Sequence, residues 1–239
     1  MIGFGQNVNI PDANLKAYLV GNSIINTNGD SEIQVSEASS FNGEINCYNM
    51  NISDLTGVES FTDLTNLTCS NNQLTSIDLS YNTALTSLNC GNNQLTSIDV
   101  SGATALSFLR VSENQLTILD VSTNTALTFL YCLYNQLINL DLRNGNNINI
   151  NYISLSGNPN LNCINVDDAS FSSANWTNID PQNYFSNNCS GTTDIEIHTI
   201  NKELIKITDI FGREVNEKRN NLLFYLYEDG TVEKKIIIE

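Results

Sequence analysis

Positively charged residues are scarce in this chain. Its 239 residues include 10 lysines and arginines against 26 aspartates and glutamates, which gives a formal net charge of −16. Residues 1–191 contain only Lys16, Arg110 and Arg143 as bases. Such a charge repels phosphate backbones and anionic lipid surfaces, so neither nucleic acid nor a membrane surface is expected as a partner. Since no run of 18 apolar residues occurs, no transmembrane segment is expected either.

Histidine is nearly absent as well, because His198 is the only one. A Ser-His-Asp or Cys-His arrangement is therefore not expected within the repeats. The sequence also lacks CxxC, HExxH and phosphate-loop motifs. The carboxylates are numerous, but many of them recur at a fixed spacing, which explains them as features of a repeat. We therefore expect a protein without enzymatic activity and without a catalytic residue.

Internal repetition is what the sequence has in abundance. The segment beginning Leu64 (LTNLTCSNNQL) recurs from Leu85, Leu106 and Leu127, in steps of 21 residues. A shorter half-motif of the form xxIDLxxN lies between the copies. This pattern resembles bacterial leucine-rich-repeat (LRR) proteins of the 21-residue type over residues 42–162. A single repeat cannot bury its own apolar side, so the repeats must stack into a solenoid with one continuous core. The fold class expected is a mostly β LRR solenoid with little helix.

Three residue columns follow from the 21-residue register. The first is an inward asparagine ladder that should hydrogen-bond the backbone of the next turn. The second consists of cysteines, with Val111 in one place, and indicates apolar core, although a metal site or disulfides along the column are alternatives. The third consists of aspartates that either cap local turns on a solvated face or form a cation-binding stripe. The asparagine column is Asn72, Asn93, Asn114, Asn135 and Asn158. The cysteine column is Cys47, Cys69, Cys90 and Cys132. The aspartate column is Asp78, Asp99, Asp120 and Asp141.

Residues 163–191 interrupt the repeat with an aromatic-rich stretch. Such a stretch suits a cap, because the last repeat of a solenoid must be covered. The segment is similar to the C-terminal cap of secreted bacterial LRR proteins. That resemblance implies a disulfide between Cys163 and Cys189, and hence an oxidising compartment.

Residues 1–41 are expected to form the N-terminal cap, with a short helix over residues 11–20. A loop resembling the calcium-binding loop of an EF-hand follows the helix. Asn26, Asn28 and Asp30 stand at the side-chain oxygen positions, Glu32 supplies a backbone carbonyl, and Glu37 fits the bidentate position. Asn at the first position and Ser at the sixth depart from the motif, so Ca²⁺ would bind weakly, with a dissociation constant of about 10⁻⁴–10⁻³ M. The alternative is an Asn/Asp-rich turn without metal.

Residues 192–239 carry most of the bases and are expected to form a small C-terminal β-module, with a hairpin in its last 19 residues. The segment DIFGRE at residues 209–214, the turn at Asp229-Gly230 and the basic-then-apolar ending resemble the sorting domain of type IX secretion cargo. The usual Pro-Asn-Pro entry motif is missing. The resemblance implies contact with the secretion machinery and export. Residues 1–6 look like the end of a removed leader, and an ordinary start is the alternative.

The outward positions of the main strands predict the binding surface. They are small and polar in the early repeats and aromatic in the later ones. A contiguous exposed patch of this kind is typical of an interaction site. The alternative is that the rings only pack on one another or lie under the C-terminal module. The candidate ligand-binding residues are Phe108, Arg110, Phe129, Tyr131, Tyr134 and Tyr152.

Taken as a sequence, the chain is thus expected to be secreted or held at the outer cell surface. Its expected function is to bind an extracellular protein or glycan. The competing hypothesis is a structural or adhesive surface component without a discrete ligand site.

Overall fold

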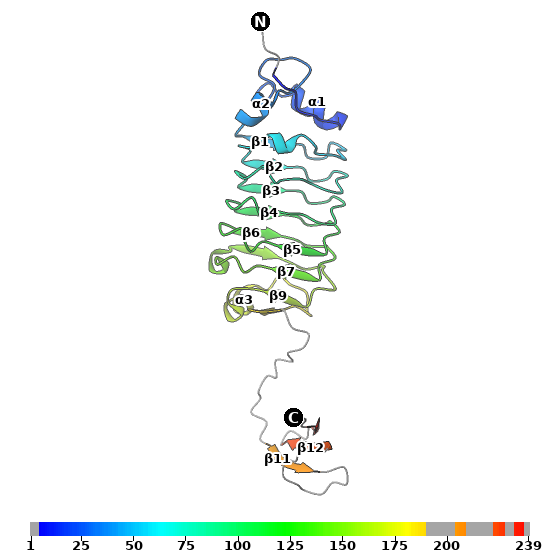
Figure 1. Ribbon diagram of the computed structural model, residues 1–239, viewed down its shortest axis with the longest axis vertical. Helices are drawn as coiled ribbons and strands as arrows, with labels where there is room; N and C mark the ends of the chain where they lie inside the picture. The colour runs from blue at the N-terminus through cyan, green and yellow to red at the C-terminus, as the bar shows by residue number, and fades with distance from the viewer. Residues whose placement is uncertain (1–4, 190–203, 209–221, 228–231, 237–239) are drawn as a thin grey trace. The chain divides into compact units, whose positions relative to one another are not determined.

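The structure is a computed structural model that describes residues 5–189, 204–208, 222–227 and 232–236. The chain divides into two compact units, Met1–Cys189 and Ser190–Glu239. The first unit is the solenoid, in which successive turns stack along one axis between helical caps (Figure 1). The leader prediction for residues 1–6 falls largely outside the described residues.

One face of the solenoid is a parallel sheet of six short strands. Each strand buries its central Leu or Ile, and its flanking residues are at least partly exposed, which is the alternation that the repeat predicts; the exception is Ser154 at the end of the last strand, which is buried. Neighbouring turns pair residue for residue, so equivalent positions form straight columns. The strands, in sheet order, are β1 (Glu44–Asn46), β2 (Asn66–Thr68), β3 (Ser87–Asn89), β4 (Phe108–Arg110), β6 (Phe129–Tyr131) and β8 (Tyr152–Ser154).

The short half-motif forms a second parallel sheet on another side of the turns. Its order is β10-β9-β7-β5, so it covers the later part of the unit. Three-residue 3₁₀ turns, η1 (Val58–Ser60) and η2 (Asn147–Asn149), are the only helical elements described between residues 42 and 162. The strands are β5 (Ile118–Asp120), β7 (Asn139–Asp141), β9 (Cys163–Asn165) and β10 (Tyr184–Ser186).

The core between the two faces is a stack of aliphatic layers that includes the cysteine column. Cys47, Cys69, Cys90 and Cys132 are free and fully buried, as is Val111 in the same column. Burial raises the pKa of Cys90 and Cys132 to about 12. These thiols therefore stay protonated and pack as small apolar side chains, which selects the core interpretation over disulfides along the column.

The asparagine ladder ties each turn to its neighbour. The Oδ1 atom of Asn114 accepts from the backbone N–H of Leu95 at 2.9 Å, and its Nδ2 donates to the carbonyls of Cys90 and Val111 at 3.1 Å each. Asn93 and Asn135 repeat this pattern one turn away on either side. The expected direction was wrong: each amide binds the backbone of its own turn and of the preceding turn, not the next.

The N-terminal cap closes the first turn with two helices, α1 (Ala13–Gly21) and α2 (Val35–Ser40). Asp12 caps α1 by accepting from the N–H groups of Asn14 and Leu15. The hydroxyl of Tyr18 on α1 accepts from the N–H of Asn46 at 2.9 Å. Because β1 is the edge of its sheet, this contact satisfies an edge donor that would otherwise be open to pairing with another chain.

The C-terminal cap is held by rings and a disulfide. Trp176 packs edge-to-face against Phe171 and Phe185, with ring centroids 6.4 and 5.5 Å apart. Cys163 and Cys189 form a disulfide, which confirms the pairing implied by the family resemblance. Helix α3 (Ala169–Asn175), which begins at the N-cap Asp168, is an element that the repeat pattern did not predict.

In the second unit the described residues form a three-stranded antiparallel sheet. Its strands are β11 (Leu204–Thr208), β12 (Leu222–Tyr227) and β13 (Val232–Ile236), and β12 and β13 pair as the predicted hairpin. His198, the DIFGRE segment at residues 209–214 and the Asp229-Gly230 turn lie outside the described residues.

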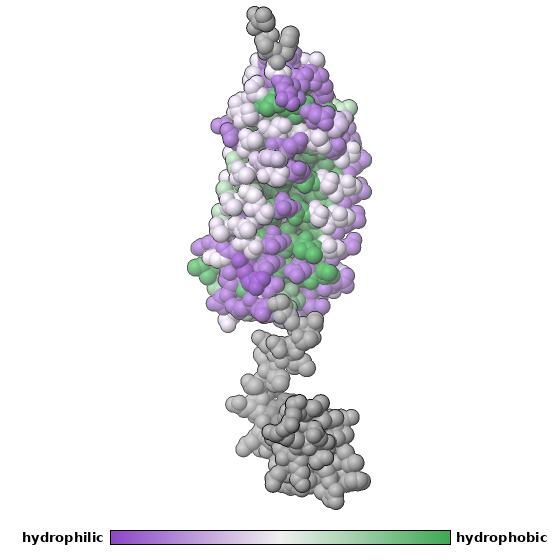
Figure 2. Space-filling view, in the orientation of Figure 1, coloured by the Kyte–Doolittle hydropathy of each residue, from purple (hydrophilic) through white to green (hydrophobic). Residues whose placement is uncertain are grey.

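The surface of the solenoid is not uniformly polar. Figure 2 shows apolar surface in a lengthwise band on the face turned to the viewer, between polar margins. Ile118, the first residue of β5, and Ile138, which precedes β7, are among the exposed apolar residues. Within the described residues, no helix combines the length and hydropathy that a membrane crossing requires.

Replacing Asn114 by Ala should destabilise the solenoid. It would leave the Leu95 N–H and several buried carbonyls unpaired, at about 1–3 kcal/mol for each unsatisfied group. Urea unfolding followed by circular dichroism should therefore show a loss of at least about 2 kcal/mol. Asn139→Ala, at an exposed strand position, is the matched control and should change stability little. Equal stability of the two variants would contradict the structural role of the ladder.

Candidate functional site

Two outward columns of the six-stranded sheet hold the predicted ligand-binding residues. Pairing aligns Glu44, Asn66, Ser87, Phe108, Phe129 and Tyr152 in one column. It aligns Asn46, Thr68, Asn89, Arg110, Tyr131 and Ser154 in the other. The sheet therefore changes along its length, from small polar side chains on β1–β3 to rings on β4–β8.

Four of the predicted residues form a connected ring cluster. Phe108 contacts Phe129 and Tyr131, with ring centroids 6.3 and 5.7 Å apart. Tyr131 stacks on Tyr152 at 5.0 Å. The first three rings are half-buried and Tyr152 is exposed. Each ring pair contributes about 0.5–1.5 kcal/mol of interaction free energy beyond that of its buried area, so the contacts hold the rings of the cluster in place.

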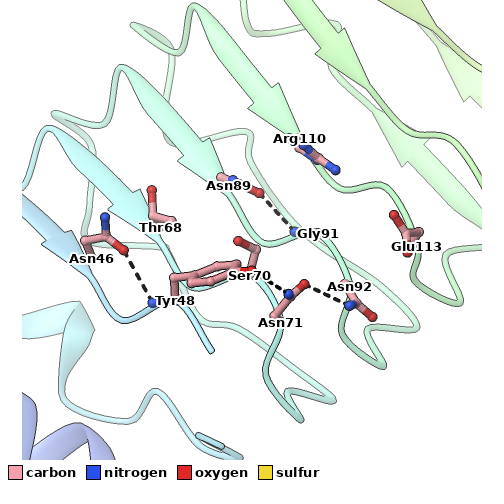
Figure 3. A pocket seen from close by; sticks show the side chains of 10 residues that line it. All are labelled: Asn46, Tyr48, Thr68, Ser70, Asn71, Asn89, Gly91, Asn92, Arg110 and Glu113. Atoms are coloured by element: carbon pink, nitrogen blue, oxygen red, sulfur yellow. Dashed lines mark hydrogen bonds between the residues drawn. The ribbon is translucent and has the colours of Figure 1, made fainter. Parts of the chain in front are cut away.

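Tyr134 and Arg110 flank this cluster without joining it. Among the described contacts, neither side chain stacks on the four rings. Tyr134 is 65% exposed and lies over Gly157, where a Cβ atom would come within 2.5 Å of its ring. The missing side chain of Gly157 therefore makes the room that Tyr134 occupies. Arg110 lines a different part of the sheet (Figure 3), where its Nε lies next to Gly91 of the preceding turn, 3.3 Å from the place of a Cβ atom on that glycine.

Tyr134 also occupies a strained backbone position. The turn that follows each main strand contains a residue with positive φ, and the turn after β1 contains two, Asn49 and Asn51. Asn71 and Asn92 fill this place in the early turns, Glu113 and Tyr134 fill it later, and Gly157 fills it last. Asn and Gly tolerate this conformation, whereas a bulky residue such as Tyr costs about 1–2 kcal/mol. Strain of this kind gathers at functional sites. Its strained backbone, at φ 52°, thus identifies Tyr134 as a candidate functional residue of this surface.

A polar groove lies at the other end of the same sheet. Its volume is about 470 Å³, and it runs past the ends of β1–β4 (Figure 3). The outward column that contains Arg110 predicted part of the lining of this groove, but the lining residues that come from the turns were not predicted. Its lining consists of Asn46, Tyr48, Thr68, Ser70, Asn71, Asn89, Gly91, Asn92, Arg110 and Glu113.

The predicted calcium loop lies between α1 and α2 and is closed by its own hydrogen bonds. The Oδ1 atoms of Asn26, Asn28 and Asp30 accept from the N–H groups of Gly29, Asp30 and Glu32, respectively. Both oxygens of Glu37 are also engaged, one by Thr27 and Asn28 and the other by Gln34.

Glu37 and Glu32 each have a further role in this cap. Burial alone would raise the pKa of Glu37, but the hydrogen bonds from Gln34, Thr27 and Asn28 lower that pKa overall, so Glu37 is charged at neutral pH. The side chain of Glu32 pairs with Lys16 at 2.7 Å, and only its carbonyl was expected to bind the ion.

No three His, Cys, Asp or Glu side chains within the described residues are grouped to hold a metal. That finding does not test the loop, because two of its expected ligands are amides and one is a carbonyl. Calcium binding by this loop therefore stays a prediction.

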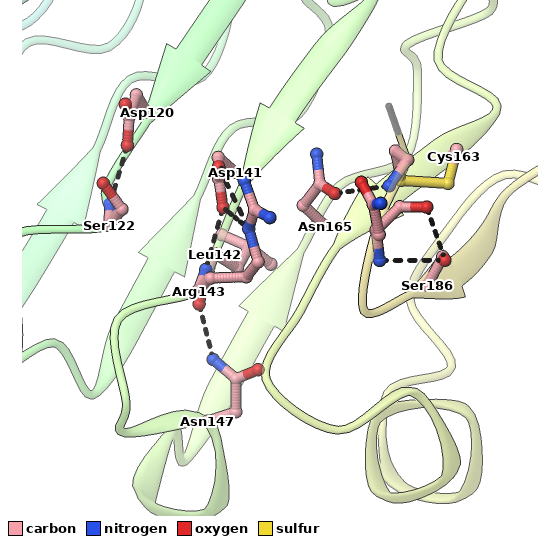
Figure 4. Close-up of polar contacts among 11 residues, drawn as sticks. Asp120, Ser122, Asp141, Leu142, Arg143, Asn147, Cys163, Asn165 and Ser186 are labelled. Carbon is pink, nitrogen blue, oxygen red and sulfur yellow. Dashed lines mark hydrogen bonds and ion pairs between the residues drawn. A yellow bond between two sulfur atoms is a disulfide. The ribbon is translucent and has the colours of Figure 1, made fainter. Parts of the chain in front are cut away.

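The aspartate column caps turns. Each Oδ1 atom accepts from the backbone N–H two residues later, at 2.8–3.0 Å, in Asp78, Asp99, Asp120 and Asp141 (Figure 4 shows the last two). Hydrogen bonds from Ser80 and Ser101 lower the pKa values of Asp78 and Asp99. Arg143 pairs with Asp141 at the end of the column. These contacts favour the turn-capping interpretation, and cation binding along the column stays a hypothesis.

Comparison with known proteins is consistent with the repeat architecture. The model of the family described as the LRR domain of the endo-β-N-acetylglucosaminidase EndoS matches residues 10–144. Internalin J of Listeria monocytogenes is 49% identical over 39 residues, which are 16% of this chain and 4% of that protein.

A solved structure agrees over a longer stretch. It is described as the functional domain of InlJ from Listeria monocytogenes, which includes a cysteine ladder. It superposes with a TM-score of 0.53 at 32% identity and covers 70% of this chain. The chain covers only 39% of that structure, so it corresponds to part of its relatives' length.

Calcium at about ten times its expected dissociation constant should stabilise the chain by about 1.4 kcal/mol over a chelator control, because it would bind only the folded loop. Thermal melting of the full chain measures this. Glu37→Gln should abolish the difference, and Glu44→Gln, which alters an exposed acid on β1, should retain it. An unchanged melting temperature of the parent chain would show that the loop is a turn without metal.

Proposed function

Because this chain belongs to the leucine-rich-repeat family represented by the EndoS LRR domain, we propose that it is a non-catalytic recognition protein. In this proposal the solenoid binds an extracellular protein or glycan through the outward face of its six-stranded sheet. The observation that supports this most is the ring cluster of Phe108, Phe129, Tyr131 and Tyr152. Its rings stand on rigid, paired strands and present a continuous aromatic surface.

The strain at Tyr134 is a second, independent support. The same turn accepts Asn without strain elsewhere in the solenoid, so stability alone gives no reason for Tyr there. A tyrosine that is 65% exposed and costly to fold suits a binding role, since Tyr is a common interface anchor.

An extracellular location fits the rest of the molecule. A structural disulfide persists in oxidising compartments and is rare in the cytosol. Export would proceed through the C-terminal module, whose sequence resembles type IX sorting domains.

Ring variants should separate binding from folding. The full chain is screened against arrayed glycans and extracellular proteins, and each hit is tested with Phe129→Ala, Tyr131→Ala and Tyr134→Asn. Each variant should weaken binding at least tenfold, whereas Ser87→Ala, in the same column but outside the cluster, should not. Tyr134→Asn should at the same time leave the melting temperature unchanged or raise it, because Asn relieves the strain. If all three variants bind a hit as tightly as the parent chain, the ligand site lies elsewhere. A screen without hits would favour the alternative that the protein is a structural or adhesive component without a discrete ligand site.

The export proposal is tested by fusing residues 190–239 to a periplasm-targeted reporter in a bacterium with type IX secretion. The reporter should reach the cell surface or the medium. The fusion with residues 209–214 replaced by Gly-Ser repeats should stay in the periplasm. Equal retention of both fusions would mean that the module only stabilises the protein.

A further inference from the structure

We propose that the polar groove on β1–β4 binds an oligosaccharide that carries one acidic sugar. In this proposal the carboxylate pairs with Arg110, hydroxyls meet the asparagine amides, and a sugar face lies on Tyr48. The inference rests on the proposed function, since it takes the same sheet as the recognition face, and it names the chemical class of the ligand.

The ring of Tyr48 is fixed in place at one end of the groove. Its hydroxyl accepts from Nδ2 of Asn71 at 3.0 Å, and Oδ1 of Asn71 accepts in turn from Nδ2 of Asn92 at 2.8 Å. Tyr48 is nevertheless 52% exposed, so the chain of contacts holds the ring without covering it. Figure 3 shows the ring reaching across the turn toward Ser70 and Asn71. An ordered, open ring is a stacking platform for the apolar C–H face of a sugar.

Between Tyr48 and Arg110 the groove offers unpaired hydrogen-bond donors. The Oδ1 atoms of Asn46 and Asn89 accept from the backbone N–H groups of Tyr48 and Gly91. These contacts orient both amides and leave each Nδ2 without a partner in the described part of the chain. Because β1 and β3 lie two strands apart, the donors are separated by roughly 10 Å along the sheet. A ligand with hydroxyls at intervals along its length matches such a row.

Arg110 supplies the charge. Of the three bases in residues 5–189, Lys16 pairs with Glu32 and Arg143 with Asp141, whereas Arg110 has no carboxylate within ion-pair distance among the described residues. In a chain with 16 more acids than bases, an unpaired guanidinium on the sheet favours an anionic group on the ligand. A guanidinium binds a carboxylate through two parallel hydrogen bonds.

Gly91 makes room for this arrangement at the floor of the groove. A Cβ atom there would lie 3.3 Å from Nε of Arg110 and 3.2 Å from the carbonyl of Ser112. The guanidinium therefore rests over bare backbone. A side chain at this position would force the guanidinium to shift from where it lies.

The groove also argues against other ligands. Glu113 stands at the same end as Arg110, and the high negative charge of the chain repels a polyanion, so a ligand with a single carboxylate fits better than a sulfated polymer. A protein partner would need an apolar anchor pocket at the centre of its interface. This lining of amides, hydroxyls and one ring offers none.

Isothermal titration of the full chain with 3′-sialyllactose, an aldotriouronic acid that carries one glucuronate, and lactose tests the proposal. The first two probes distinguish a sialic-acid source of the carboxylate from a uronic-acid source. At least one acidic probe should bind no less than tenfold more tightly than lactose. Arg110→Gln and Tyr48→Ala should each weaken that binding at least tenfold, and Gly91→Ala should weaken it as well.

Gly102→Ala is the matched control for Gly91→Ala. Its new methyl group would meet only the carbonyl of Ser80, at an ordinary 3.6 Å, and its affinity should equal that of the parent chain. Circular dichroism melting confirms that each variant folds. Arg110 and Tyr48 are surface side chains, so their variants keep the test valid even if Gly91→Ala does not fold.

Equal binding of lactose and the acidic probes, or acidic-probe binding that survives Arg110→Gln, would overturn the proposal. So would the failure of both acidic probes to bind at millimolar concentration. A partner that is lost with Phe129→Ala in the absence of any acidic-sugar binding would leave the proposed function standing and refute only the groove. Acidic-sugar binding with no hit that depends on the rings would support the groove and the recognition role of the sheet, and would refute only the ring cluster as a binding surface.

Discussion

The asparagine ladder is the constraint on which the rest of the molecule depends. Each buried amide satisfies the backbone of two adjacent turns at once, so the spacing and register of neighbouring turns are set by the same atoms. The aliphatic layers could tolerate small sliding of one turn over another, because apolar contact has no direction. The amide contacts cannot, since a shift would leave buried donors and acceptors unpaired. The straight columns on the outward face are a consequence of this inward geometry.

Because buried contacts fix the spacing of the turns, the residue types at outward positions are free to vary. They change progressively along the solenoid. Amides and hydroxyls occupy the first strands and rings occupy the last, with Arg110 at the boundary between them. The turns after β2 to β6 change in the same direction, from Asn through Glu113 to Tyr134, and the turn after β8 has Gly157. One sheet thus presents a polar region and an aromatic region side by side, which suits a ligand that combines hydroxyls with apolar faces.

The sequence predicted the parts of the structure that repeat. Period and residue type together indicated the strands, the buried Cys and Asn columns and both outward columns, because each of these features recurs at an equivalent position in successive turns. It erred on the direction of the asparagine contacts, since a column alone does not say which neighbour an amide faces. It missed α3, which is not part of the repeat. The groove was also hidden, because it depends on Tyr48 and Gly91, and neither is exceptional until backbone and side chains are placed together.

The main strands begin at residues 44, 66, 87, 108, 129 and 152, so the turns differ slightly in length, yet equivalent residues of neighbouring turns stay in register. A whole turn inserted or deleted between β1 and β4 would move Tyr48 and Arg110 apart or together by one strand spacing, about 4.8 Å, without altering either cap. A slightly longer turn also keeps the ladder: Asn158 lies 23 residues after Asn135, yet its Nδ2 donates to the carbonyl of Cys132 and its Oδ1 accepts from the N–H of Leu137. The number of turns, and not their exact length, therefore sets the length of the outward face. The outward face thus grows or shrinks only by whole strand spacings. Related chains could fit longer or shorter ligands by gaining or losing complete turns. Their stability would remain approximately a sum of similar contacts between neighbouring turns.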